Sequence, residues 1–202
     1  MEGTVMKVYH LMGSAPYYTN CYLMTDNQGN AVLFDCSIRW EKIDAILKND
    51  NAQLKAVFMT HGHHDHRECM DELRANCDAP IYMGRQDILQ FHMENLKEFK
   101  DKETFEIGEI KIFAFHTPGH TPGGYCFKCE DMLICGDTLF AGTVGRTDLP
   151  GGDYATIMDS LRIINEVVGK QNPKVMPGHA HFSTFSQEKV QNPYLKEAIK
   201  CL

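Results

Sequence analysis

The alternation of apolar and polar residues predicts a chain of mixed strands and helices. Short apolar runs bounded by turn residues are typical of strands, whereas apolar residues three or four positions apart indicate helices. Strands are expected at 6–11, 21–25, 31–34, 54–59, 81–83, 104–107, 110–115, 124–127, 132–135 and 174–176. Helices are expected at 40–47, 67–76 and 86–99, after a cap at Asp153, and from Ser186, with an interruption at Asn192-Pro193.

The order of these elements predicts an α/β fold. Antiparallel hairpins occur beside strand–helix–strand units, so we expect mixed sheets that are covered by helices. The chain has 202 residues, of which 43% are hydrophobic and 23% are charged, and these values are ordinary for a globular protein. Since no stretch rich in Pro, Gly or Ser separates two parts, residues 1–202 are predicted to form a single domain.

Charge and hydropathy argue against two classes of partner. The formal net charge of -7 disfavours general binding to nucleic acid, which requires a basic surface. No window approaches the roughly 20 apolar residues of a membrane span, and the N-terminus has no basic targeting region. We therefore expect a cytoplasmic protein without a membrane partner. Its eight cysteines lack disulfide-like spacing and are predicted to be reduced and mostly buried.

The densest group of chemically active residues is the stretch Thr60–His66, which contains four histidines and one aspartate between a predicted strand and a predicted helix. Residues two apart in extended chain face the same way, so His61 and His63 can point at one object. Asp65 and His66 open the helix and can point at a second object. Burying these groups is unfavourable unless something pairs with them, and His and Asp are suitable ligands for zinc or iron.

Three further sites place a polar side chain at or after the end of a predicted strand. A stiff loop rich in Pro and Gly presents His120, whereas Asp137 and His179 follow two later strands. Together the sequence offers His61, His63 and His120 as ligands for a first metal ion, and Asp65, His66 and His179 as ligands for a second. Asp137 can bridge both ions. Seven groups for two ions, with a position left open for water, predict a catalytic two-metal site.

Two other histidines in these segments are not interpreted as metal ligands. His116 lies before the stiff loop and is interpreted as structural. His181 follows the last strand and is expected behind the metal ligands or on the surface.

The order of these motifs strongly resembles the metallo-β-lactamase superfamily of hydrolases. The shared motifs are His61-x-His63-x-Asp65-His66, the loop 116–124, the segment 136–140 and the final Pro177-Gly178-His179. Segments 136–148 and 178–195 are most similar to the glyoxalase II branch, and the resemblance spans residues 20–195. It implies an αβ/βα four-layer sandwich, in which two mixed β-sheets are flanked by helices and the metals lie at the sheet edge.

The resemblance also implies a binuclear hydrolase that cleaves a small thioester, such as S-lactoylglutathione. Two divalent ions, expected to be zinc with iron or manganese as alternatives, would share the attacking hydroxide, and Asp65 would bind one ion and orient that hydroxide. Arg146 is a candidate for holding a substrate carboxylate, with an ion pair to Asp148 or Asp153 as the alternative. The chain ends at Leu202, so it resembles the short subgroup without the helical domain of longer relatives. The thiol carrier and the oligomeric state stay open.

A persulfide dioxygenase is the main alternative on the same fold. Superfamily members of this kind use one iron held by two histidines and an aspartate, here His61, His120 and Asp137. The commonest true β-lactamases place a cysteine where this chain has Asp137, which argues against antibiotic hydrolysis.

A non-enzymatic alternative rests on Cys126-x-x-Cys129 with nearby Cys135, which could form a redox or zinc-binding module. The period-two pattern places all three in or beside a hairpin, and a fourth ligand at suitable spacing is missing. We therefore interpret them as packing residues.

Overall fold

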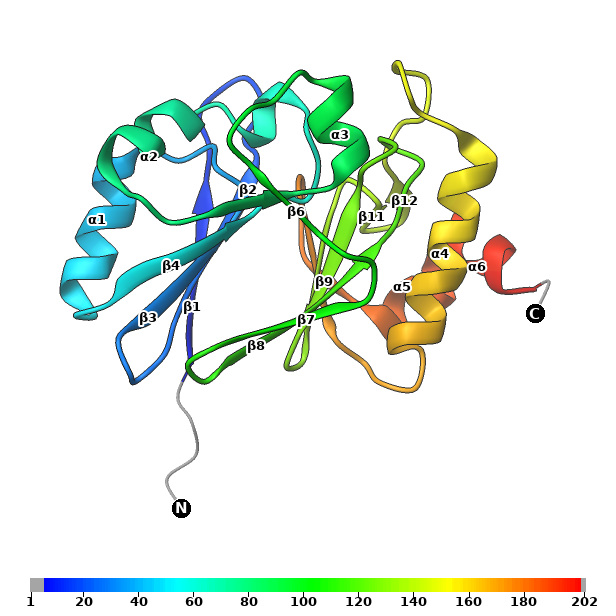
Figure 1. Cartoon of the computed structure of the whole chain (residues 1–202). Helices are drawn as coiled ribbons and strands as arrows, with labels where there is room; N and C mark the ends of the chain where they lie inside the picture. Colours follow the sequence, from blue (N-terminus) through cyan, green and yellow to red (C-terminus); the bar gives the residue numbers. More distant parts are fainter. Residues whose placement is uncertain (1–5, 201–202) are drawn as a thin grey trace.

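The computed structural model describes residues 6–200, and most of these residues form two facing β-sheets and the helices outside them (Figure 1). The first sheet has the order β1-β2-β3-β4-β5-β6. Its strands are β1 (Lys7–Met12), β2 (Asn20–Thr25), β3 (Asn30–Phe34), β4 (Gln53–Phe58), β5 (Ile81–Met83) and β6 (Lys97–Glu98).

The second sheet has the order β14-β13-β10-β9-β8-β7. Its strands are β7 (Glu103–Ile107), β8 (Ile110–His116), β9 (Tyr125–Cys129), β10 (Met132–Gly136), β13 (Lys174–Pro177) and β14 (Ser183–Thr184). A separate small hairpin joins β11 (Leu139–Phe140) to β12 (Thr143–Val144). Both large sheets mix parallel and antiparallel pairs, as predicted.

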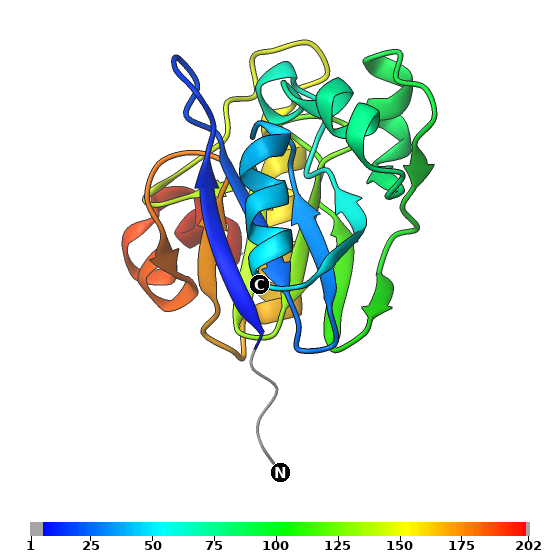
Figure 2. The ribbon, with the colours of Figure 1, turned by 90° about the vertical axis from the view of Figure 1, so that its left-hand side faces the viewer.

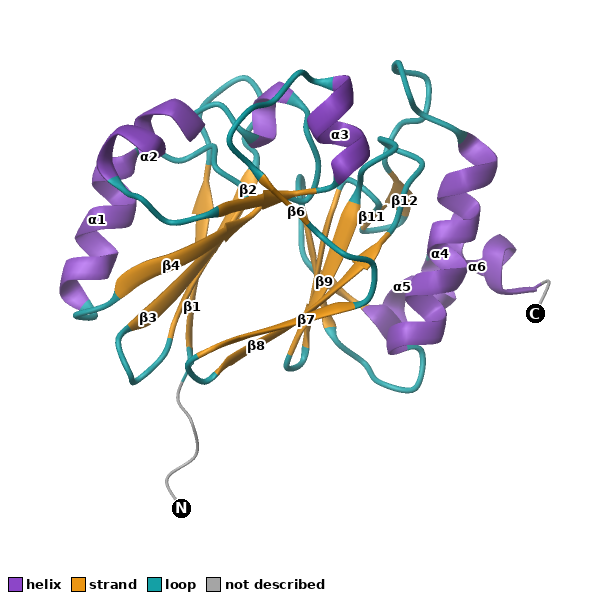
Figure 3. Cartoon of the chain, in the orientation of Figure 1, coloured by secondary structure: helices purple, strands orange, loops and turns teal. Residues whose placement is uncertain are grey.

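The helices cover the outer faces of the two sheets (Figure 3). Those beside the first sheet are α1 (Trp40–Asn49), α2 (Met70–Asn76) and α3 (Arg85–Gln90), with a short 3₁₀ turn η1 (His64–His66). Figure 2 faces the first sheet and shows α1 in front of its strands. Those beside the second sheet are α4 (Tyr154–Val168), α5 (Phe185–Gln191) and α6 (Pro193–Lys200). The layers run helix, sheet, sheet, helix, which confirms the predicted sandwich.

Apolar side chains that alternate between the two faces of each sheet produce three apolar layers. In β2, Tyr22 and Met24 point between the two sheets, whereas Cys21 and Leu23 point toward the helices of the first sheet. A third cluster lies between the second sheet and α4, α5 and α6. Because successive side chains of a strand point to opposite faces, each sheet can contribute to two layers at once.

Aromatic rings fill the layer between the sheets. The ring of Phe58 lies 5.6 Å from that of Phe34, 4.9 Å from that of Phe105 and 5.8 Å from that of Phe127, between centroids. Rings at these separations gain both buried area and favourable edge or offset contacts. Phe58 is the last residue of β4, so this packing fixes the strand that leads into the histidine cluster.

Local capping explains where the later helices begin. The side chain of Asp153 accepts a hydrogen bond from Thr156 N, as its predicted role requires. Thr184 and Gln187 form a capping box at the start of α5. The predicted interruption at Asn192-Pro193 is confirmed, because α5 ends at Gln191 and α6 starts at Pro193.

The predicted helix at 86–99 is wrong in its second half. α3 ends at Gln90, and β6 adds a short strand at Lys97–Glu98. His92 and Asn95 have φ of 51° and 57°, values that a right-handed helix does not allow. The helix predicted at 67–76 is also shorter, since η1 precedes it and α2 starts only at Met70.

The cysteines pack in separate apolar layers. Cys126 and Cys135 lie in the cluster beside α4, whereas Cys129 points between the two sheets. Residues three apart in a strand face opposite sides, so these thiols do not converge on one ligand. The seven described cysteines are unpaired, and Cys201 lies outside the described residues. Within residues 6–200, no helix combines the length and the apolar character needed to cross a membrane.

Replacing Phe58 by Ala should lower the free energy of unfolding by about 3–5 kcal/mol, because the side chain is fully buried and its removal leaves a cavity between the sheets. Urea unfolding followed by circular dichroism measures this loss. The control is Leu89→Ala on α3, where the side chain is exposed and the change should stay within about 0.5 kcal/mol. Equal losses in both variants would contradict the role assigned to the aromatic layer.

Cys129→Ala should leave the metal content of the protein unchanged, because this thiol packs between the sheets and away from the other two cysteines. The free energy of unfolding should fall by about 1 kcal/mol. Elemental analysis of the purified variant checks the first point, with His120→Ala as the comparison that should lose metal. Metal loss in Cys129→Ala would instead support a redox or zinc-binding module formed by these cysteines.

Candidate metal centre

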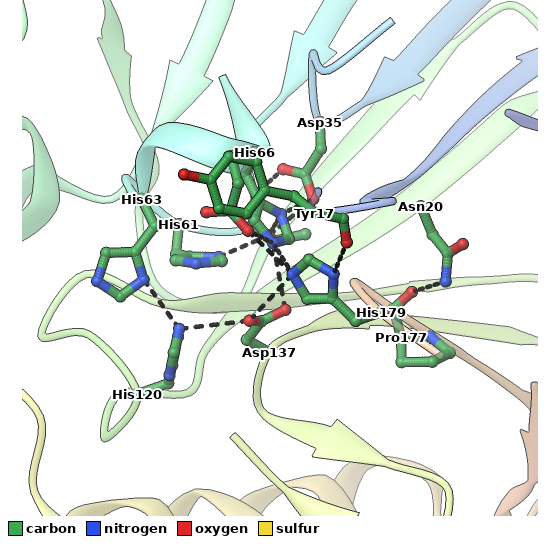
Figure 4. Close-up of polar contacts among 12 residues, drawn as sticks. Tyr17, Asn20, Asp35, His61, His63, His66, His120, Asp137, Pro177 and His179 are labelled. Atoms are coloured by element: carbon green, nitrogen blue, oxygen red, sulfur yellow. Dashed lines mark hydrogen bonds and ion pairs between the residues drawn. The ribbon is translucent and has the colours of Figure 1, made fainter. Parts of the chain in front are cut away.

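The ends of several strands converge at one edge of the sandwich and carry polar side chains (Figure 4). β8 and β10 each pair antiparallel with β9, and β10 pairs parallel with β13. The carboxyl ends of β8, β10 and β13 therefore lie at the same edge of the second sheet. The segment after β4 reaches this edge from the first sheet, where Tyr125 N donates a hydrogen bond of 2.8 Å to Thr60 O.

The structure brings together all seven side chains that the sequence offers as metal ligands. They form overlapping groups whose ligand atoms lie within 4.8 Å of one another: His61, His63 and His120; His61, His66 and Asp137; and Asp65, His66 and His179. Nitrogen and carboxylate oxygen donors in such groups suit divalent transition metals.

The first group lies on the side of the loop after β8. His63 Nδ1 is 2.9 Å from His120 Nε2. The ring of His61 lies 4.9 Å from that of His63 and 4.8 Å from that of His120, between centroids. Three imidazoles at these separations can offer one nitrogen each to a single ion.

The second group joins η1 to the turn after β13. His179 Nε2 lies 3.0 Å from Asp65 Oδ2 and 3.3 Å from His66 Nε2. Gly178 makes this approach possible, because a Cβ there would lie 2.3 Å from Asp137 Oδ1 and 2.5 Å from His66 Cε1. A side chain at position 178 would therefore displace members of the group.

Asp137 lies between the two groups. Its Oδ1 is 3.2 Å from His66 Nε2, whereas its Oδ2 is 3.5 Å from His120 Nε2 and 3.6 Å from His179 Nε2. The carboxylate thus faces both groups, which is the geometry that a bridging ligand needs.

Hydrogen bonds to Nδ1, the ring nitrogen that points away from the cluster, fix the tautomer and the orientation of three of the histidines. Each Nδ1 faces an oxygen that can only accept, so it carries a proton and leaves Nε2 toward the cluster. The pairs are His66 with Asp35 Oδ2 at 2.8 Å, His120 with Arg146 O at 2.7 Å and His179 with Tyr17 O at 3.1 Å.

His61 provides the most direct test of fit for a metal. The hydroxyl of Thr60 donates to Asp35 Oδ2 at 2.8 Å, so it can accept from His61 Nδ1 at 3.1 Å. His61 Nε2 is then left buried with no hydrogen-bond partner. Since an unpaired buried polar atom is unfavourable, this lone pair fits a bound cation.

The protonation states agree with a cation-binding role. Burial and the neighbouring imidazoles lower the pKa of His61 well below its ordinary range, and they lower the pKa of His63 to about 4. Burial opposes ionisation of Asp65, but the hydrogen bond with His179 and the charges of His66 and His179 together outweigh it and lower the pKa of Asp65 to about 2. Burial also opposes protonation of His66, yet the carboxylates of Asp35 and Asp137 raise its pKa. That negative potential attracts a cation as it attracts a proton.

Asp87 is a buried site residue that sequence reasoning missed. Its Oδ2 accepts from Gly62 N and Thr121 Oγ1, both at 2.8 Å, and its Oδ1 accepts from Gly123 N at 2.6 Å. It therefore ties the segment of His61 and His63 to the loop of His120. No local signal in the sequence marks it, because it lies near the start of a helix and its partners are distant in the chain.

Other candidate residues lie outside the three groups. The side chain of Arg146 is exposed and pairs with Asp148 through two contacts of 2.7 Å, and only its main-chain oxygen contacts a ligand, His120. His116 Nε2 lies 2.8 Å from Pro122 O and braces the loop that carries His120. His64 and His181 are exposed.

Two facing sheets covered by helices, with a histidine and aspartate cluster at their shared edge, define the class of metal-dependent hydrolases with the metallo-β-lactamase fold. The chain belongs to the metallo-β-lactamase superfamily, since the family model described as "Metallo-beta-lactamase superfamily" matches residues 15–179.

Two curated relatives have similar sequences. The probable polyketide biosynthesis zinc-dependent hydrolase PksB of Bacillus subtilis is 33% identical over 178 residues, which cover 86% of this chain and 79% of that protein. The hydroxyacylglutathione hydrolase GloC of Haemophilus influenzae is 30% identical over 205 residues, which cover 89% of this chain and 93% of that protein.

Three solved structures share the fold over nearly the whole chain. BLEG-1 B3 metallo-beta-lactamase has a TM-score of 0.79 at 27% identity, covering 94% of this chain and 99% of that chain. TTHA1623 in a di-iron-bound form has a TM-score of 0.78 at 25% identity, covering 92% and 99%. ETHE1 from Myxococcus xanthus has a TM-score of 0.76 at 26% identity, covering 93% and 83%.

Replacing Asp87 by Asn should weaken metal binding about 10–100-fold, because an amide N–H₂ would then face one of the donors that the carboxylate now accepts. Zinc binding to the metal-free protein, measured by competition with a chelator, checks this. Asp71→Asn is the control, since the Asp71 side chain is fully exposed on α2. Unchanged zinc affinity in a folded Asp87→Asn protein would contradict the positioning role.

Proposed function

We propose that this protein is a binuclear metal-dependent thioester hydrolase of the glyoxalase II type, which cleaves S-acyl thiol conjugates such as S-lactoylglutathione. The observation that carries the proposal is the shared carboxylate of Asp137, which faces both His120 and the pair His66 and His179. Such an arrangement supplies ligands for two adjacent ions. Zinc is the expected metal, and iron or manganese suits the same donors.

Two divalent ions in these groups would lower the pKa of water toward about 7 and polarise the thioester carbonyl. The protein's own contribution is to hold and orient the reacting groups. Asp65 is ionised, lies beside His179 and has a side chain that is 19% exposed, so it can accept a hydrogen bond from an attacking water. This assigns Asp65 both a ligand role and an orienting role.

The exposure of the cluster indicates the side from which a substrate arrives. His61, His66 and His120 are buried, whereas His63, Asp65 and His179 are partly exposed. A small thioester can therefore approach over the partly exposed members. The leaving thiol has an ordinary pKa of about 8.5, so it needs little help from a general acid.

The relatives support this assignment at different levels. GloC, which carries the name hydroxyacylglutathione hydrolase, supports thioester hydrolysis, and PksB, which is described as zinc-dependent, supports zinc. The di-iron form of TTHA1623 supports a two-metal site and shows that iron occurs on this fold.

Arg146 would have to leave Asp148 before it could hold a substrate carboxylate.

The first test measures metal content and S-lactoylglutathione hydrolysis together, on protein purified without added metal. We expect close to two metals per chain and measurable thioesterase activity. His63→Gln should lower activity by more than about 100-fold, because it removes a proposed ligand. The matched control is the neighbouring His64→Gln, since His64 is exposed and lies outside the three groups.

The same measurements distinguish the proposed hydrolase from the main alternative, a persulfide dioxygenase. A single iron per chain, no thioesterase activity and oxygen uptake with glutathione persulfide would overturn the proposal in favour of a dioxygenase. Full activity in His63→Gln would also sink it, because the reaction would then not depend on the proposed ligand set.

A further inference from the structure

The turn that carries His179 is held by several hydrogen bonds. Tyr22 Oη donates to Pro177 O at 2.6 Å and Gly178 N donates to Gly136 O at 2.8 Å, and Asn20 makes three further bonds around His179. Asn20 is the first residue of β2 and is 2% exposed. Its main-chain N–H donates to Gly178 O at 2.7 Å. Its Nδ2 donates to Pro177 O at 3.0 Å and to Ala180 O at 3.2 Å. Asn20 therefore binds the carbonyls on both sides of His179.

The orientation of the Asn20 amide is itself fixed. Its Oδ1 lies 2.7 Å from His10 Nε2, and because this oxygen can only accept, His10 donates the proton. The His10 ring packs against Tyr22 and Phe182, with centroids 5.7 Å and 4.8 Å away. A rotated amide would lose the His10 bond and direct its oxygen at the two carbonyls of the turn.

The turn needs such support. Ala180 has a φ of 63°, a left-handed conformation that is unfavourable for a residue with a Cβ atom. The β13–β14 pairing ends at Val175 and the β10–β13 pairing ends at Pro177, so neither includes Ala180. The side chain of His179 is held in addition by Tyr17 O, from the loop that precedes Asn20 (Figure 4).

We propose that Asn20 is a positioning residue for His179, and that it sets metal affinity at the group of Asp65, His66 and His179. The inference deepens the proposed function and rests on its two metal sites. The other group is held differently, because Asp87 and the main-chain oxygen of Arg146 support it. Loss of the Asn20 amide should therefore affect one metal site and spare the other.

Asn20→Asp tests this, because it replaces the Nδ2 donor with an oxygen that faces two carbonyls. Zinc is added to the metal-free protein in competition with a chromophoric chelator. We expect one of the two zinc ions to bind about 10–100-fold more weakly and the other to stay within about twofold. Asn30→Asp is the matched control, since Asn30 Nδ2 also makes a partly buried bond, to Asp26 Oδ2 at 2.9 Å in a distant hairpin.

The control separates positioning from general destabilisation. Both substitutions are expected to lower thermal stability, but only Asn20→Asp should change zinc affinity. In a His179→Ala background, adding Asn20→Asp should change zinc affinity by less than about twofold, because the residue through which Asn20 acts is already gone.

Three outcomes would overturn the inference: wild-type affinity for both ions in Asn20→Asp, equal weakening of both ions, or equal effects of the Asn20 and Asn30 substitutions. A wild-type protein that binds one zinc would instead contradict the two-metal function. In that case, a single zinc that is lost in His179→Ala but is insensitive to Asn20→Asp would overturn the positioning role as well.

Discussion

The constraint on which the site depends is the burial of several imidazoles and carboxylates at one edge of the sandwich. Such groups are unfavourable in an apolar interior unless each polar atom has a partner. The protein meets this condition from outside the cluster, through acceptors such as Asp35 Oδ2 and Tyr17 O that bind the Nδ1 atoms. Within the cluster, His61 Nε2 and Asp137 Oδ1 are left without a hydrogen-bond partner, and both atoms fit a bound cation.

The fold supplies these acceptors because both sheets end at the same edge. Asp35 follows β3, and its carboxylate binds Thr60 N at 2.8 Å as well as His66. It has a φ of 58°, so the chain turns sharply as it leaves the strand. The aromatic layer around Phe58 fixes β4 against the second sheet, so a rigid core stands behind the ligands.

Sequence reasoning predicted every strand longer than two residues and the clustered histidines and aspartates because both have local signals. The candidate ligands lie at or shortly after the ends of apolar runs, and His or Asp at such a place can be recognised in the sequence. The error at 86–99 has a physical reason: apolar spacing continues past Phe91, but His92 and Asn95 adopt positive φ and redirect the chain into β6. Asp87 was missed because its role depends on contacts with residues far away in the chain.

The loop before β2 contacts the turn of His179 and borders the partly exposed face of the cluster. Tyr17 contributes its main-chain oxygen to His179, while its own ring remains half exposed beside the partly open face of the cluster (Figure 4). Asn20 anchors the same segment to the turn of His179. A change in this loop would therefore reach the ligand through two hydrogen-bonded connections. For that reason we expect changes in this segment to move the imidazole of His179.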